Sequence, residues 1–79
     1  MKISEFIDAE IEEIENEEGG HPPEELDAIA EKVASEYKTE CVVDYIGGFD
    51  STGYEIDCYA FAYTEDGKLT IHGYNYECY

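Results

Sequence analysis

Residues 54–63, YEIDCYAFAY, alternate between two kinds of side chain, and this pattern predicts the central strand of a small antiparallel sheet. One predicted face carries mostly small apolar side chains, on which helices can pack: Tyr54, Ile56, Cys58, Ala60 and Ala62. The opposite face is acidic at one end and aromatic at the other: Glu55, Asp57, Tyr59, Phe61 and Tyr63. An aromatic face of this kind is unusual in water, so the pattern favours a partner that covers it.

Two further strands are predicted beside this one. Residues 40–46 are rich in β-branched side chains and alternate, which indicates a first strand. Residues 69–78 form the third, after a tight turn at Asp66-Gly67. We expect Leu69 and Ile71 to face the helices. The predicted aromatic face then consists of six side chains: Tyr59, Phe61, Tyr63, His72, Tyr74 and Tyr76.

Two amphipathic helices are predicted before the sheet. In residues 4–18 the apolar side chains form one helical stripe: Phe6, Ile7, Ile11 and Ile14. Ser4 suits the N-cap of this helix, and the glycines at 19–20 end it. A second helix over residues 23–37 has its own apolar stripe and packs beside the first as a hairpin.

The predicted fold is α+β, a helical hairpin packed on a three-stranded antiparallel meander in the order ααβββ. The 79 residues make a single domain, 1–79. One face of the sheet is expected to stay uncovered by helices. The predicted core contains eight aliphatic side chains: Ile7, Ile11, Ile14, Leu26, Ile29, Val33, Ile56 and Ile71.

Acidic residues dominate the charge of the chain. Twenty-one Asp and Glu residues against four lysines give a net charge of −17, far beyond the magnitude of about 2 to 8 that keeps a small domain soluble. Direct binding of nucleic acid or an anionic membrane is excluded, because both need clustered basic residues. The expected partner is a basic protein surface. The carboxylates predicted to bind it lie on the two helices and between them: Glu5, Asp8, Glu12, Glu13, Glu15, Glu17, Glu18, Glu24, Glu25 and Asp27.

Catalysis and cofactor binding are not expected. The three cysteines, Cys41, Cys58 and Cys78, have no paired spacing, so we interpret them as packing residues of a reduced protein with no metal site and no cofactor. No basic residue stands ready to activate a thiol, and the many carboxylates resemble a solvated surface more than an acid–base pair. No signal peptide or membrane span is evident, which predicts a cytoplasmic protein.

Both candidate surfaces have alternative interpretations. The aromatic face could stack bases as RNA-binding sheets do, but it lacks their Arg and Lys, so burial against a second copy or a partner protein is favoured. The acidic surface could be an adaptation to high salt, although the chain keeps eight isoleucines and three cysteines. Imitation of a nucleic-acid backbone is favoured over that adaptation. Carboxylates such as Glu5, Asp8 and Glu12 recur about 5 to 6 Å apart, a spacing comparable with phosphates along one strand.

In size, charge and the pairing of an acidic helical hairpin with a small sheet, the chain resembles the phage-encoded anti-CRISPR proteins and, more loosely, DNA-mimic anti-restriction proteins. The resemblance is one of type, without a shared motif, and assigns no role to any single residue. It implies a non-enzymatic inhibitor in the cytoplasm of an infected bacterium. Such an inhibitor blocks the DNA-binding surface of a CRISPR effector complex.

Overall fold

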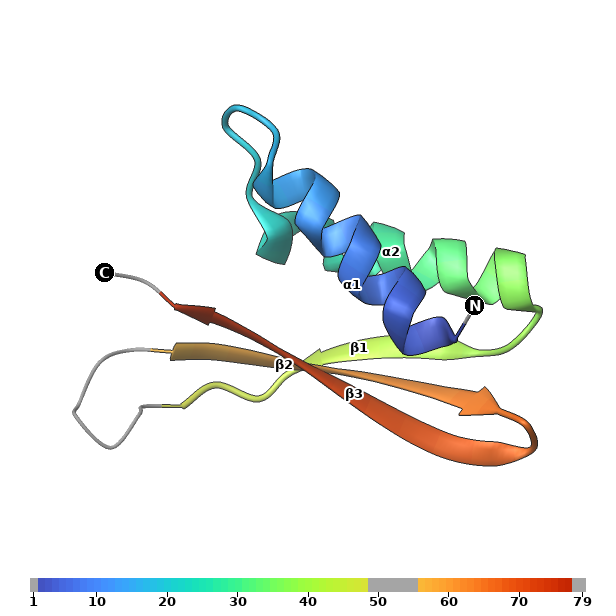
Figure 1. Cartoon of the computed structure of the whole chain (residues 1–79). Coiled ribbons are helices and arrows are strands. Elements are labelled where there is room, and N and C mark those ends of the chain that lie inside the picture. Colours follow the sequence, from blue (N-terminus) through green and yellow to red (C-terminus); the bar gives the residue numbers. More distant parts are fainter. Residues whose placement is uncertain (1, 49–55, 78–79) are drawn as a thin grey trace.

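Two helices and three strands make up the computed structural model, which describes residues 2–48 and 56–77. The elements follow one another as α1 (Ile3–Glu15), α2 (Pro22–Tyr37), β1 (Cys41–Tyr45), β2 (Ile56–Glu65) and β3 (Lys68–Glu77). The strands pair antiparallel in the order β1-β2-β3, and both helices lie on one face of the sheet (Figure 1). The predicted α+β fold is therefore confirmed. Tyr54, Glu55 and Cys78, which were assigned to strands, lie outside the described residues.

Helix α1 begins and ends earlier than predicted. Lys2 is the N-cap residue, so the assignment of Ser4 was wrong. The carboxylate of Glu5 accepts a hydrogen bond from the Lys2 amide at 3.3 Å, and that of Glu65 accepts one from the Ile3 amide at 3.0 Å. These carboxylates satisfy the free amides that a serine hydroxyl would otherwise cap. The helix stops at Glu15 because no apolar side chain follows Ile14 to hold further turns, and the next carboxylates oppose the helix dipole.

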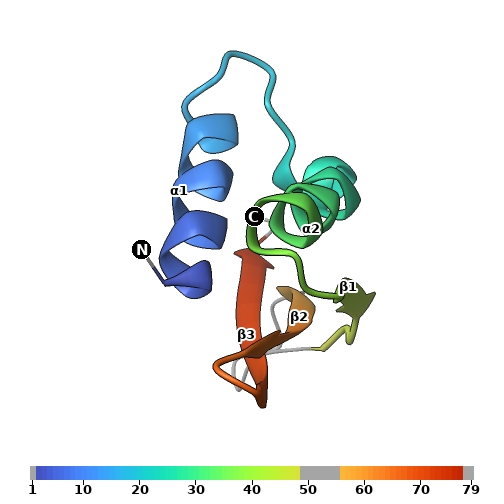
Figure 2. The ribbon, with the colours of Figure 1, turned by 90° about the vertical axis from the view of Figure 1, so that its right-hand side faces the viewer.

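Helix α2 starts at Pro22, one residue before the prediction, and ends at Tyr37 as predicted. Proline suits the first turn because its missing N–H has no partner there in any case. Lys38 follows the helix in the left-handed conformation, with a φ of 51°. The two helices lie side by side above the sheet (Figure 2).

The face of the sheet that meets the helices is the opposite of the predicted one. Phe61 and Tyr63 are 0% and 2% exposed in the core, whereas Leu69 and Ile71 are 74% and 66% exposed. The predicted core position of Ile71 was therefore wrong, and Ile56 is only half-buried. Bulky rings fill the space beneath the helical hairpin to the packing density of a native core. Alanine and glycine at neighbouring positions are too small to fill it.

The helical half of the predicted core is confirmed. All six predicted aliphatic side chains of the helices are buried: Ile7, Ile11, Ile14, Leu26, Ile29 and Val33. The sheet contributes rings from β2 to this core and half-buried side chains from β1, Cys41 and Val43. The core is therefore aliphatic on the side of the helices and mainly aromatic on the side of the sheet.

The register of the sheet follows from the Asp66-Gly67 turn. Both residues have positive φ, 53° and 77°, as a two-residue hairpin turn of the predicted kind requires. Glu65 pairs with Lys68 beside the turn, and the pairing continues to Ile56 opposite Glu77. On the other side of β2, Val43 lies opposite Phe61. Residues 41, 43, 59, 61, 63, 72 and 74 thus share the face beneath the helices.

Candidate functional site

The carboxylates predicted to bind a partner all lie on the surface. We call them the acidic helical surface, and each is exposed: Glu5, Asp8, Glu12, Glu13, Glu15, Glu17, Glu18, Glu24, Glu25 and Asp27. Two carboxylates of α2 that the prediction did not include, Glu31 and Glu36, are exposed as well. The described part of the chain therefore carries a broad negative surface on the side of the molecule away from the sheet.

The orientation of this surface is set by the buried stripe of each helix. Ile3, Ile7, Ile11 and Ile14 point into the core, so the opposite side of α1 faces solvent, while Phe6 and Glu10 at the margin of the stripe are half-buried. One outward row runs along the helix: Glu5, Asp8, Glu12 and Glu15. Residues three and four apart are about 5 to 6 Å from each other on a helix, so the row presents a regular line of negative charge.

Few basic side chains lie beside the carboxylates of α1 and α2 in the described residues. Lys32 Nζ of α2 lies 3.2 Å from Glu10 Oε2 of α1. His72 Nε2 of β3 lies 2.7 Å from Asp8 Oδ1, which fixes one edge of α1 above the sheet. The Asp8 side chain stays 65% exposed in that contact. Most of the negative charge of these carboxylates is consequently balanced by ions in the solvent and not by the described basic side chains.

A small groove between the helices concentrates the negative charge. It has a volume of about 110 Å³ and is lined in part by the carboxylates of Glu10, Glu13, Glu17 and Glu25 with the ammonium of Lys32. Four acids around one lysine leave a net negative site. Such a groove can accept the ammonium or guanidinium group of another protein, which carries several hydrogen-bond donors and no acceptor.

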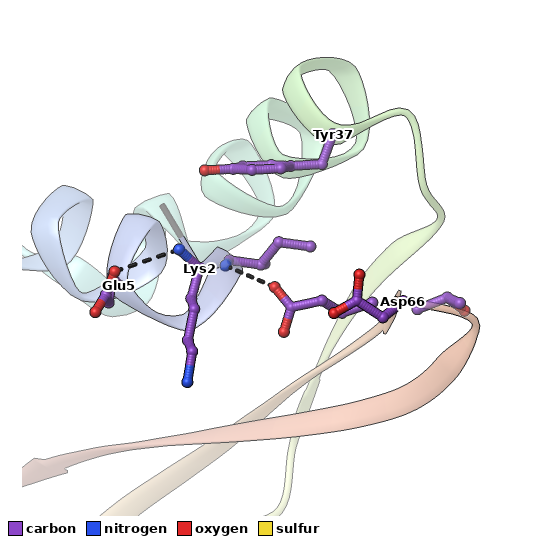
Figure 3. Close-up of a pocket in the computed structure, with 7 residues that line it drawn as sticks. Lys2, Glu5, Tyr37 and Asp66 are labelled. Atoms are coloured by element: carbon purple, nitrogen blue, oxygen red, sulfur yellow. Dashed lines mark hydrogen bonds between the residues drawn. The ribbon is translucent and has the colours of Figure 1, made fainter.

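A second depression lies where α1 begins, with a volume of about 660 Å³ and an open mouth. Figure 3 shows Lys2, Glu5, Tyr37 and Asp66 around it. The Tyr37 ring packs edge-on against Phe6, with ring centroids 5.6 Å apart. This ring contact joins α1 to the end of α2, and the hydrogen bond from the Ile3 amide to Glu65 joins the start of α1 to the end of β2. The depression thus has a structural role in joining the two layers.

The prediction that the aromatic face is open is wrong, and partner binding by its half-buried members stays a prediction. Phe61 and Tyr63 are buried beneath the helices, and the other members are half-buried: Tyr59, His72, Tyr74 and Tyr76. The physical reason is the same packing requirement that orients the sheet, because the rings are the side chains large enough to fill the core. Phe61 and Tyr63 are therefore not accessible for base stacking or for contact with a protein partner.

The half-buried tyrosines contact one another and the end of the helical hairpin. Tyr59 lies between Tyr45 and Tyr74, with centroid distances of 5.2 and 6.3 Å. Tyr45 donates its hydroxyl to Asp57 at 2.9 Å, and Tyr76 packs edge-on against His21 at 5.2 Å. Burial, with smaller contributions from Glu15 and neighbouring tyrosines, raises the pKa of Tyr74 to about 12. The Tyr74 ring is therefore neutral at physiological pH, and its contacts give it a structural role.

Burial makes one of the two described thiols, Cys41, less reactive. Cys41 and Cys58 are free and half-buried, and burial raises the pKa of Cys41. A raised pKa lowers the fraction of thiolate, the nucleophilic form. Among the described residues, no group of His, Cys, Asp or Glu side chains is placed to hold a metal ion.

The sheet surface turned away from the helices is aliphatic, and the sequence prediction missed it. Large exposed side chains stand on the outer strands, and small residues occupy the central strand and one position of β3. We call this the aliphatic sheet face: Val42, Ala60, Ala62, Leu69, Ile71 and Gly73. The signal for it was present in the sequence, since alternate residues of the central strand differ sharply in volume and only the larger set can fill a core.

Comparison with known proteins adds no family to this description: no family model, curated protein or solved structure matches the chain. Within the described ranges, neither helix is long and apolar enough to cross a membrane.

Proposed function

We propose that this protein is a non-enzymatic inhibitor whose acidic helical surface binds a basic nucleic-acid-binding surface in place of DNA. The observation that carries the proposal is the exposure of the carboxylates on α1 and α2, most of them with no lysine or histidine beside them in the described residues. The partner we propose is a CRISPR effector complex, because a channel that holds DNA presents the required basic surface. The protein would act in the cytoplasm of the bacterial host.

Charge alone supports strong attraction to such a surface. A net charge of −17 on 79 residues is costly to the fold through self-repulsion, and that cost is offset when a basic partner neutralises it. Both binding partners carry condensed or loosely held counterions that are released on contact, as they are when DNA binds. Affinity is therefore expected to depend steeply on salt.

The regular arrangement of the carboxylates supports imitation of DNA over non-specific attraction between opposite charges. The row Glu5, Asp8, Glu12 and Glu15 lies on a helix held rigid against the sheet by its isoleucines. A rigid row of charges at regular spacing loses little conformational entropy on binding, compared with a disordered acidic tail. The groove beside Lys32 offers a defined position for one basic side chain of the partner.

A displacement assay tests the proposal. Labelled target DNA bound to CRISPR effector complexes of several types is titrated with the protein, and fluorescence anisotropy reports the DNA that remains bound. We expect the protein to displace DNA from at least one complex. A variant in which Glu12, Glu13, Glu15 and Glu17 are changed to Gln should displace it far less effectively.

The matched control for these changes is Asp66→Asn. It removes a carboxylate from the exposed hairpin turn, away from the acidic helical surface, and asparagine tolerates the positive φ of that position. This variant should displace DNA as the parent does. Failure to displace DNA from any complex would overturn the proposed partner, and equal activity of the Gln variant would overturn the proposed surface.

A further inference from the structure

We infer that the aliphatic sheet face is a self-association surface, on which two copies of the chain pack sheet against sheet with their acidic helices outermost. This inference goes beyond the proposed function, because it uses the opposite side of the molecule. It places four layers in the order helices, sheet, sheet, helices. Three observations carry it: the exposed apolar area, the shape of the face and the distribution of charge.

The exposed apolar area is large for so small a protein. Leu69 and Ile71 are 74% and 66% exposed, and Val42 on the other outer strand is 56% exposed. Ala62 lies between Val42 and Ile71 in the register, so the apolar side chains form a continuous band across all three strands. Contiguous apolar surface of this kind marks an interaction site in soluble proteins.

The dimensions of the face match a weak dimer. Ten residues at about 3.4 Å each make β2 and β3 about 34 Å long, and strands lie about 4.8 Å apart, so two faces in contact cover roughly 800 to 1,000 Å² in total when the shorter β1 is included. That area stands at the lower limit of specific interfaces, below the roughly 1,600 Å² of stable complexes. We therefore expect a dimer that dissociates on dilution.

The shape of the face suits a second copy. Ala60 and Ala62 occupy the central strand β2, Ile71 and Val42 stand on either side of Ala62, and Gly73 on β3 lies beside Ala60. Under a two-fold axis, the large side chains of one copy lie over the small residues of the other, and the reverse contact forms at the same time. Interdigitation of this kind is how paired sheets pack at a separation of about 10 Å.

The charge distribution also favours a second copy over a basic partner. Among strand residues whose side chains are described, Asp44 is the one charged residue on this face, so it offers little to attract a basic protein. Two copies that meet here keep their acidic helices on opposite outer surfaces. At about 10 Å per layer the helices are about 30 Å apart, several times the Debye length of about 8 Å at physiological salt.

Sedimentation velocity over about a hundredfold range of protein concentration tests the inference, because a weak dimer follows mass action. We expect monomer at the dilute end and dimer at the concentrated end. Added salt should increase the dimer fraction, since it screens the repulsion between two copies of charge −17. This salt dependence is opposite in sign to that expected for binding to a basic partner, so the two proposals fail independently.

A pair of lysine substitutions locates the surface. Ile71→Lys places a charge in the middle of the proposed interface and should weaken the dimer at least tenfold. Ala9→Lys adds the same charge at an exposed position of α1 and should leave the dimer as strong or strengthen it. Ile71→Thr keeps a β-branched residue in the strand and should weaken the dimer less than lysine does. Circular dichroism of each variant confirms that the monomer fold is kept.

Three results would overturn the inference. The parent could stay monomeric at every concentration in both low and high salt, in which case the face fits a different protein. The dimer could persist unchanged in Ile71→Lys. Ala9→Lys could disrupt the dimer as strongly as Ile71→Lys, which would place the interface on the helices.

Discussion

At the scale of single residues, the sheet contributes to the core mainly through two rings. Phe61 and Tyr63 are among the largest fully buried side chains of the described structure, and they lie beneath both helices. Cavities left by ring removal collapse poorly, so such positions carry more stability than exposed aliphatic residues of the same strands. The orientation of the sheet can therefore be measured through single substitutions.

Phe61→Ala is expected to lower the free energy of unfolding by about 3 to 5 kcal/mol, whereas Ile71→Ala should change it by less than about 0.5 kcal/mol. Urea unfolding in dilute solution, where a weak dimer has dissociated, measures both. If Phe61→Ala does not fold, Phe61→Leu gives the same ordering with a smaller loss. A larger loss from Ile71→Ala than from either Phe61 variant would mean that the sheet faces the other way.

Tyr74 makes stability sensitive to alkaline pH. Burial, then Glu15 and neighbouring tyrosines, raise the pKa of this residue from its usual 10.0 to about 12 in the folded protein. The folded state therefore keeps a proton that the unfolded state loses. The stability that Tyr74 contributes is complete below about pH 10 and is lost as the pH rises towards about 12.

Unfolding by urea at about pH 9.5 and about pH 12 should therefore show a smaller loss of stability in Tyr74→Phe than in the parent. The two proteins differ at this position alone, so the comparison between them isolates the contribution of Tyr74. An equal loss in the two proteins would contradict the assignment of Tyr74 as a buried, neutral ring.

At the scale of elements, the sequence predicts the helices and the hairpin well because their signals are local. The isoleucine stripe of α1 and the Asp66-Gly67 turn each depend on residues within a few positions of one another. Which face of the sheet meets the helices depends on which side chains can fill the space beneath them. The alternation of side chains along a strand does not decide between the two faces. Comparing the volumes of Phe61 and Tyr63 with those of Ala60 and Ala62 would have decided it.

The acidic helical surface was predictable for the same reason. Once Ile7 and Ile11 are placed in the core, helical geometry assigns the carboxylates of α1 to solvent, apart from the half-buried Glu10. The cap at Lys2 was not predictable, because Glu65 comes from a strand far away in the sequence and reaches the start of α1 only in the folded chain.

Like-charge repulsion within α1 is testable through Glu13. Glu10 and Glu17 stand three residues before it and four residues after it, so Glu13→Gln removes two unfavourable pairs. We expect the free energy of unfolding to rise by about 0.2 to 0.5 kcal/mol per pair at low salt and the gain to vanish at high salt. Glu36→Gln is the matched control, because Lys32 lies four residues before Glu36. Removal of the Glu36 carboxylate relieves no such repulsion and should not raise the free energy of unfolding. A Glu13→Gln variant less stable than the parent at low salt would contradict this account.

At the scale of the whole molecule, the two sides differ in chemistry. The helical side is negative and exposed, while the opposite side of the sheet is aliphatic with one described charge in its strands. A dimer through the aliphatic sheet face would carry two acidic surfaces that point away from each other. Such an assembly could engage two basic sites at once, which raises apparent affinity without any new contact.

The central claim is that the acidic helical surface takes the place of DNA, and the salt dependence of partner affinity tests it most directly. The dissociation constant for the effector complex identified by displacement is measured over a series of salt concentrations for three proteins. These are the parent, the variant with Glu12, Glu13, Glu15 and Glu17 changed to Gln, and the Asp66→Asn control. We expect the affinity of the parent to fall steeply as the salt concentration rises. The Gln variant should bind several-fold more weakly per substitution, and its affinity should depend clearly less on salt. The control should show a salt dependence close to that of the parent. An affinity and a slope unchanged in the Gln variant would contradict the claim.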